Sequence, residues 1–134
     1  MTMNRQDYEQ NYVDTAEAAI LALREQEKND RRRDGSLLTT TKLRNLLGMT
    51  MDIYQMVMAG QEEKLDEEAC SRIEYLRVRF LYEAGREEAV RRLVKEAGVL
   101  DILKSVGRSR SAYLKFCRYM EALVAFHRYY GGAD

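Results

Sequence analysis

Arginine and tyrosine side chains alternate along residues 72–86, where Arg72, Tyr75, Arg79, Tyr82 and Arg86 recur at spacings of three and four. On an α-helix, which turns about 100° per residue, these five side chains fall within about 80° of arc. Guanidinium groups in such a row can contact successive phosphates, and phenol rings offer flat faces to bases or riboses. By its geometry alone, the pattern fits a solvated helix face in which arginine stems cover the rings, and it also fits a sequence-independent contact with a nucleic-acid strand.

Arg77 falls outside this row, beside the apolar stripe of the same predicted helix. The stripe that would face a core consists of Ala69, Ile73, Leu76, Phe80 and Ala84. A charged side chain at the border of a core costs on the order of several kcal/mol unless an opposite charge neutralises it. Arg77 is therefore interpreted as a member of an ion pair, or as an arginine at a contact between subunits.

Two further basic clusters precede this helix. Lys42 and Arg44 follow threonines at 39–41, which can cap a helix start, and the backbone amides of a helix start attract phosphate. Three consecutive arginines at 31–33 lie in a charged loop that ends at Gly35. These arginines could contact phosphate, and a solvated linker is the alternative.

The side chains that most often carry catalysis are scarce. His127 is the single histidine, and its apolar neighbours at helical spacing indicate a packed core residue rather than a base or a metal ligand. Cys70 and Cys117 lie within apolar stripes, which favours core thiols in a reducing compartment. No HExxH, GxSxG, GxGxxG or P-loop motif and no CxxC pair occurs. We therefore expect no catalytic residue, no metal site, no cofactor and no enzymatic activity.

Charge is balanced over the whole chain and uneven locally. Lysine and arginine number 22, as do aspartate and glutamate, so the surface as a whole does not attract nucleic acid strongly. Residues 101–130 carry six basic and two acidic side chains, whereas residues 61–74 carry two basic and six acidic ones. We expect a basic end and an acidic end, which suit head-to-tail stacking of copies as well as an ordinary solvated surface.

The pattern predicts helices throughout and no strand. The 134 residues are 46 % apolar and 33 % charged and include no proline, the commonest helix breaker. Apolar spacing, capping residues and glycines predict helices at 7–28, 39–60, 66–85, 86–97 and 109–130, with a short apolar turn or helix at 99–106. The fold class is all-α, a compact bundle of five to six helices in a single domain over residues 1–134.

No stretch approaches the roughly 20 consecutive apolar residues that cross a bilayer. The first ten residues also lack a basic-then-apolar signal pattern. We therefore expect no membrane contact and a cytoplasmic location.

Three stretches together resemble a known family: TTTKLRNLLGM (39–49), IEYLRVRFLYEAGR (73–86) and FCRYMEALVAFHRYYGG (116–132). They are similar to the small subunit of type III-A CRISPR effector complexes, the Csm small subunit. The blocks occur in the expected order within residues 36–134, the family-like bundle. Residues 1–35, an N-terminal helix and a charged loop, carry no such resemblance.

The resemblance implies an all-α subunit that is present in several copies. These copies would stack along the backbone subunits and line the channel that holds guide and target RNA. In that family the small subunit is not the nuclease: target-RNA cleavage belongs to the backbone subunits, and DNA cleavage and cyclic oligoadenylate synthesis belong to the large subunit.

Carried over to this sequence, the resemblance makes the basic residues of the three blocks the candidates for RNA contact. The first two blocks contribute Lys42, Arg44, Arg77, Arg79 and Arg86, and the third contributes Arg118 and Arg128. The helical projection agrees for Arg79 and Arg86, adds Arg72, and favours an ion pair for Arg77. A single neutral chain is expected to bind RNA weakly. Many copies bound to one strand would raise the overall affinity through avidity.

Two hypotheses follow, beside a hydrolase or metal protein that would use His127 with carboxylates, for which we expect no bound metal. The first is a non-catalytic subunit of an antiviral ribonucleoprotein that binds guide and target RNA through the backbone, together with other subunits and copies of itself. The second is a purely structural, self-associating helical scaffold without RNA contact.

Overall fold

The computed structural model describes residues 3–30 and 37–134, and within these ranges it contains seven α-helices and no β-strand. The all-α class is confirmed, and the expected count of five to six helices is too low. The helices are α1 Arg5–Gln10, α2 Tyr12–Asn29, α3 Thr40–Ala59, α4 Glu67–Arg86, α5 Glu88–Ala97, α6 Val99–Val106 and α7 Arg110–Tyr129.

The count differs because the predicted helix at 7–28 is two helices. Asn11 adopts an extended backbone conformation between them, and its side-chain oxygen accepts a hydrogen bond from the Asp14 amide at 3.0 Å. This bond caps α2 and lets α1 turn away, so that the Tyr8 ring meets the Tyr119 ring edge to face at 4.9 Å. The segment at 99–106, expected to be either a turn or a helix, is helix α6. The chain enters it through Gly98, whose backbone lies in the left-handed region.

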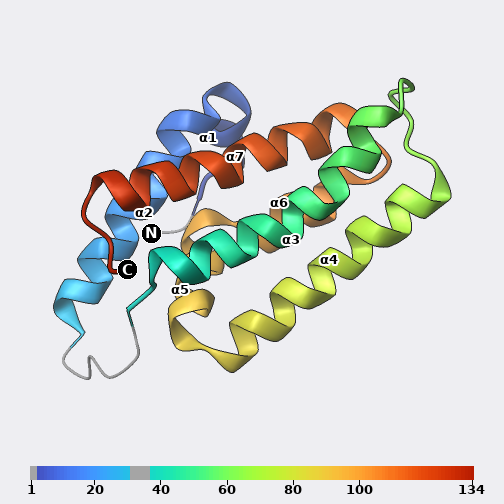
Figure 1. The fold of residues 1–134 in the computed structure, drawn as a ribbon. Helices are drawn as coiled ribbons and strands as arrows, with labels where there is room; N and C mark the ends of the chain where they lie inside the picture. The colour runs from blue at the N-terminus through green and yellow to red at the C-terminus, as the bar shows by residue number, and fades with distance from the viewer. Residues whose placement is uncertain (1–2, 31–36) are drawn as a thin grey trace.

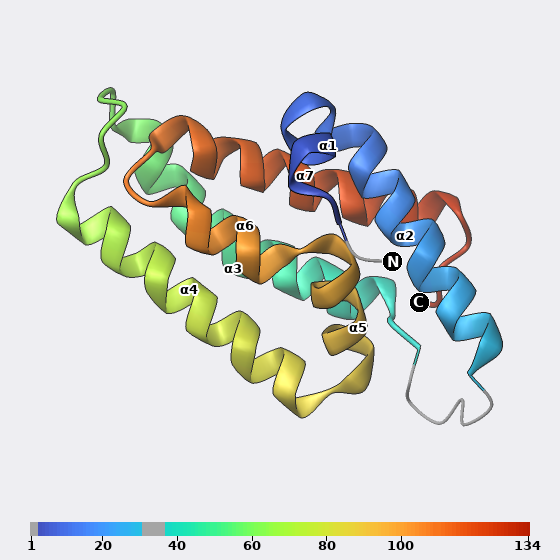
Figure 2. The same ribbon diagram turned by 180° about the vertical axis from the view of Figure 1, so that it is seen from behind.

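The three longest helices are α3, α4 and α7. They run lengthwise through the molecule, with α3 between α7 and α4 (Figure 1). Helix α3 packs against α7 and α4, α2 packs against α7 and α5, and α4 also contacts α5 and α6. Figure 2 shows α6 and α5 crossing the opposite side of the bundle between α4 and α2. Helix α4 therefore lies at one edge of the molecule, where no helix of the described ranges covers its outer face.

The core joins α4 to α7 beneath α3. Phe80 and Phe116 are fully buried, and their rings meet edge to face at 6.4 Å. Two buried tyrosines on α7 satisfy their hydroxyls with backbone carbonyls: Tyr113 donates to Thr50 O at 2.7 Å and Tyr119 to Ala97 O at 2.9 Å. Burial raises the pKa of both phenols, so both stay protonated and act as fixed donors.

His127 is fully buried and hydrogen-bonded, as its spacing predicts. Its Nε2 lies 3.1 Å from Leu38 O, and because a carbonyl only accepts, Nε2 carries the proton and Nδ1 accepts from the Thr40 hydroxyl at 3.2 Å. Gly132 lies directly against the imidazole, where an added Cβ would collide with the ring. The histidine therefore ties α7 to the start of α3 and to the C-terminal segment.

Both cysteines are free thiols; Cys117 is buried and Cys70 half-buried. Burial raises the pKa of Cys117 to about 12, so this thiol stays protonated and unreactive. None of the described helices combines the length and the apolar character that crossing a membrane requires.

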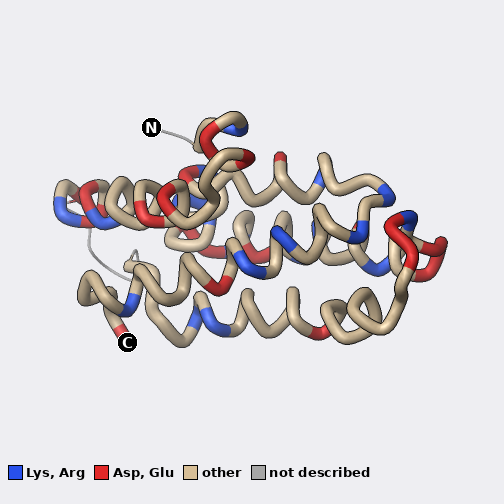
Figure 3. The backbone as a smooth tube through the Cα atoms, turned by 90° about the horizontal axis from the view of Figure 1, so that it is seen from above, with Lys and Arg blue, Asp and Glu red and all other residues tan. Residues whose placement is uncertain are grey.

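The expected separation of a basic end from an acidic end is wrong. Acidic residues do gather at the turn between α3 and α4 (Figure 3). That turn, however, packs on the start of the basic segment: Glu63 accepts hydrogen bonds from the hydroxyls of Ser109 and Ser111, and Glu67 lies 4.0 Å from Arg108. The two stretches neutralise each other locally because the chain returns along α6 to the same end of the bundle.

Candidate nucleic-acid interface

Helix α4 forms where its sequence places a cap and a single apolar stripe. The Asp66 carboxylate caps the helix by accepting from the Ala69 amide at 2.8 Å, and Glu67 and Glu68 in the first turn favour the helix dipole. The stripe identified from spacing is buried at every position: Ala69, Ile73, Leu76, Phe80 and Ala84. This burial fixes the rotation of α4 and so determines which side chains face outward.

The row of arginines and tyrosines on α4 points away from the core. Tyr75 and Tyr82 each expose 65 % of their surface, and Arg72, Arg79 and Arg86 are also exposed. We call these five residues the arginine–tyrosine ridge. The structure brings them together on one open face, as the helical projection predicts.

Ion pairs on this ridge are local and weak. Arg72 lies 3.8 Å from Glu68, and Arg86 lies 3.5 Å from Glu83, in each case on the same exposed helix. Exposed pairs of this kind contribute about 0–1 kcal/mol, so a phosphate can compete for the guanidinium groups. Arg79 forms no ion pair with any described residue.

Arg77 is half-buried and pairs with Glu74, one turn away on α4, at 3.4 Å. The predicted ion pair is therefore present, with its carboxylate on the surface of the same helix rather than inside the core. Arg77 lies on the side of α4 away from the arginines of the ridge, about 140° from Arg72 by helical rotation.

Lys42 joins the ridge through a shared carboxylate. Its Nζ lies 2.8 Å from Glu87 Oε2, and Arg86 lies 3.9 Å from Glu87 Oε1. The end of α4 and the start of α3 thus place two cations around one acid. The sequence pattern does not reveal Glu87 as the partner of Lys42, because the two residues lie 45 positions apart.

The start of α3 is not the open phosphate seat that its sequence suggests. Thr39 caps the helix by accepting from the Lys42 amide at 3.0 Å, and the Thr40 amide donates to Ala133 O at 2.6 Å. The C-terminal segment therefore occupies part of this helix end. Arg44 is exposed, and among the described residues it has no ionic partner.

Two candidates lie on another surface, on α7. Arg118 is exposed without an ion pair to a described residue, and Arg128 pairs with Asp134 at 2.5 Å. Because α3 lies between α7 and α4, these arginines do not extend the ridge (Figure 1). The arginines at 31–33 lie outside the described residues.

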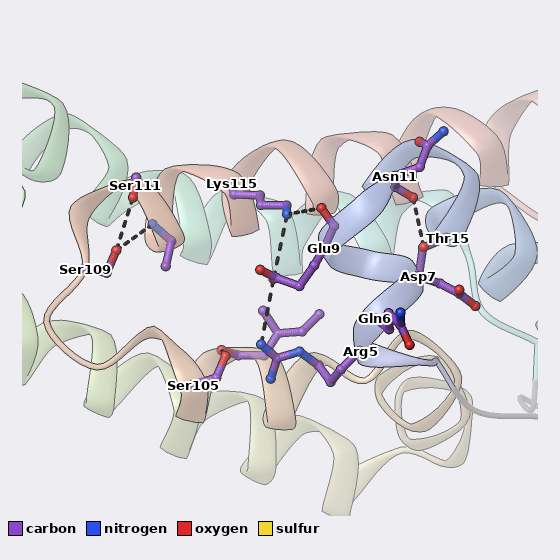
Figure 4. Close-up of polar contacts among 12 residues, drawn as sticks. Arg5, Gln6, Asp7, Glu9, Asn11, Thr15, Ser105, Ser109, Ser111 and Lys115 are labelled. Atoms are coloured by element: carbon purple, nitrogen blue, oxygen red, sulfur yellow. Dashed lines mark hydrogen bonds and ion pairs between the residues drawn. The ribbon is translucent and has the colours of Figure 1, made fainter.

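A further basic cluster was not anticipated from the sequence. Lys115 of α7 donates to Glu9 O at 3.2 Å and approaches the Glu9 carboxylate at 3.7 Å (Figure 4). Its Nζ also lies over the Tyr8 ring, 4.8 Å from the ring centre. Arg5 reaches the same carboxylate at 3.8 Å. These contacts anchor α1 to α7, and because Glu9 neutralises part of the charge, the cluster is a weaker candidate for phosphate than the ridge.

Sequence comparisons with known proteins identify a family. The sequence model of Csm2 type III-A matches residues 11–133. A protein of Streptococcus thermophilus named "CRISPR system Cms protein Csm2" is 43 % identical over 126 residues, covering 94 % of this chain and 96 % of the relative. Proteins of the same name are 40 % identical over 104 residues in Mycobacterium tuberculosis (78 % and 84 % covered) and 38 % over 99 residues in Enterococcus italicus (72 % and 71 %). The chain belongs to the Csm2 family, the small subunit of type III-A CRISPR systems.

Proposed function

We propose that this chain is a non-catalytic subunit of a cytoplasmic antiviral ribonucleoprotein. It stacks in several copies beside the other effector subunits and binds the backbone of guide and target RNA independently of sequence. It needs neither metal nor cofactor for this role, because the RNA is held while other subunits cut.

The observation that carries the proposal is the outward orientation of the arginine–tyrosine ridge. Guanidinium groups that folded inward onto carboxylates of the bundle could not contact a polyanion. Here three arginines and two tyrosines are exposed together on one helix face. Lys42 adds a fourth cation beside the end of the ridge. These side chains carry charge and flat rings, which suit phosphates and unpaired bases without reading a sequence.

Replacing Arg79 and Arg86 together by alanine tests this role in the assembled effector complex. We expect weaker retention of target RNA, by about tenfold per complex at moderate salt, because several copies each lose two phosphate contacts. The dependence of binding on salt should also become shallower. Neither arginine packs in the core, so the helical circular-dichroism signal and the unfolding midpoint should stay close to those of the parent chain.

The double variant R5A/R108A is the matched control, since it removes two exposed arginines outside α4, one on α1 and one in the turn between α6 and α7, and changes the net charge equally. Retention of target RNA should stay within about twofold in the control. Equal losses in both double variants would show that only the overall charge matters, and unchanged retention in R79A/R86A would contradict the proposed contact.

The alternative is a scaffold that binds only protein, and the exposed apolar side chains of α4 favour it. Crosslinking of assembled complexes to labelled target RNA separates the two functions. Label on this chain supports the RNA contact, whereas label on the backbone subunits alone supports the scaffold.

A further inference from the structure

Helix α4 exposes a second kind of surface beside its arginines. Val78 and Leu81, one turn apart on the helix, are 53 % and 51 % exposed and form a contiguous apolar surface with the tyrosines next to them. By helical rotation the arginines, then the tyrosines Tyr75 and Tyr82, then Val78 and Leu81 follow one another around the helix. We call Val78 and Leu81, with the two tyrosines that border them, the apolar edge of α4.

The apolar edge continues into a groove of about 570 Å³ between α4, α5 and α6. Its walls are mostly small or apolar and include Leu81, Ala84, Gly85, Val94 and Leu100. Arg91 and Lys95 lie at its border and are exposed, and Arg91 has no ion pair to a described residue. Asp101 also lines the groove and is exposed. The surface is therefore apolar in its centre, and its margin carries Arg91 and Lys95 against Asp101, a net positive charge that fits an acidic amphipathic helix.

Helix α2 of the same chain has the complementary composition. Among the described residues, only α2 and α4 expose more than one large apolar side chain, and those of α2 are Val13 and Leu21. Ala18, one turn before Leu21, is also exposed, and its small side chain allows another helix to approach closely. Asp14 and Glu25 beside them are exposed.

An acid-lined groove of about 720 Å³ lies next to this face, between α1 and α2. Asp7 and Asp14 line it together with Ala18 and Ala22, and neither acid forms an ion pair with a described residue. Arg79 and Arg91 on the α4 side are likewise without a carboxylate partner among the described residues. Each surface thus offers apolar side chains together with charges that the other surface would neutralise.

We infer that the apolar edge of α4 in one copy receives helix α2 of a second copy, with Val13 and Leu21 against Val78 and Leu81. This inference rests on the stacking proposed above and names the two faces that meet. Because the two faces differ, a pair of copies keeps one unused face of each kind, α2 on one copy and α4 on the other, and the contact can repeat into an open stack. The arginines of the ridge remain on the other side of the tyrosines, so that α4 contacts a copy with one edge and RNA with the other.

Single-cysteine variants test the contact in the full chain and in the assembled complex. In a C70S background, where Cys117 remains buried, L21C and V78C copies are mixed and treated with a short bismaleimide. We expect covalent pairs in the mixture and none when either variant is treated alone. The variant M58C is the matched control, because Met58 is a similarly exposed apolar residue on α3, and it should not couple to V78C.

A chain that carries both L21C and V78C should form covalent ladders longer than two copies. A ladder that ends at two copies would overturn the open stack, and coupling of V78C to M58C, to itself or only to another subunit would overturn the pairing of α4 with α2. RNA retention in the R79A/R86A variant is measured separately. If the cysteines fail to couple while R79A/R86A still weakens RNA retention, the contact between α4 and α2 is overturned and the proposed RNA contact stands.

Discussion

At the level of single residues, the basic candidates differ in what already neutralises them. Arg44, Arg79 and Arg118 have no ionic partner among the described residues, whereas Lys42 and Arg86 share Glu87. An incoming phosphate must displace that carboxylate, and the exchange reduces the gain in electrostatic energy. Glu87 should therefore lower the affinity of this end of the ridge for a phosphate.

Replacing Glu87 by glutamine should strengthen RNA binding. The amide keeps a hydrogen-bond acceptor for Lys42 but removes the negative charge, so we expect about threefold tighter binding at low salt, or ~0.7 kcal/mol, and less at high salt. Competition titration of the assembled complex with labelled RNA measures the change. Glu88 lies one residue further on and pairs with Arg92 at 3.7 Å, so E88Q changes the net charge equally without freeing Lys42. Equal gains in E87Q and E88Q would show that Glu87 has no special role.

At the level of elements, the break between α1 and α2 determines whether Tyr8 reaches the core. A continuous helix through Asn11 would carry Tyr8 in another direction and leave the Tyr119 ring without its edge-to-face partner. The Asn11 side chain makes two bonds to Asp14, one to its amide at 3.0 Å and one to its carboxylate at 2.9 Å. These bonds stabilise the break over the uninterrupted helix that the apolar spacing favours.

Replacing Asn11 by alanine should lower the free energy of unfolding by about 1 kcal/mol, the usual cost of losing a helix cap. Urea denaturation followed by circular dichroism measures it. The variant N45A is the control, because Asn45 is exposed within α3 and alanine is the better helix former there. A stability of N11A equal to or above that of the parent would mean that the cap does not hold the break.

At the level of the whole molecule, three distant segments meet at His127. The imidazole bonds to Leu38 O and to Thr40, and Gly132 packs on its face. Nearby, the Leu38 amide donates to the buried carboxylate of Glu27 at 2.9 Å. The ends of α2 and α7 and the start of α3 are thereby held in one cluster, so protonation of the histidine affects the whole bundle.

The stability of the fold should fall in mild acid because of His127. Burial lowers the pKa of the folded histidine below its ordinary value near 6.5, which the unfolded chain retains. Above pH 6.5 both states are neutral and the contribution is complete; as the pH falls below 6.5 the unfolded state takes up the proton first, and the free energy of unfolding decreases. Urea denaturation from pH 7.5 to 5.5 measures this slope. The chain has a single histidine, so H127Q should lose the slope, and an unchanged slope in H127Q would assign it to other groups.

The parts of the candidate site that could be predicted are those whose contacting residues lie close together in the sequence. The outward position of Arg79 and Arg86 follows from the spacing of Phe80 and its stripe, because helix rotation is set by the apolar residues within the same segment. The partners of Lys42 and the occupied start of α3 could not be predicted. They depend on Glu87 and Ala133, which reach α3 only after the chain has folded back on itself.

By itself, the sequence determined that the chain is helical, which side of each long helix is buried, and, through three blocks of residues, its family. Each of these rests on periodicity or local order along the chain. The tertiary structure alone decided that the acidic turn between α3 and α4 neutralises the start of α7, that Glu87 lies between two cations, and that the face of α4 stays uncovered. These features depend on how distant segments pack, and the free energy of that packing comes from the core as a whole rather than from any local pattern.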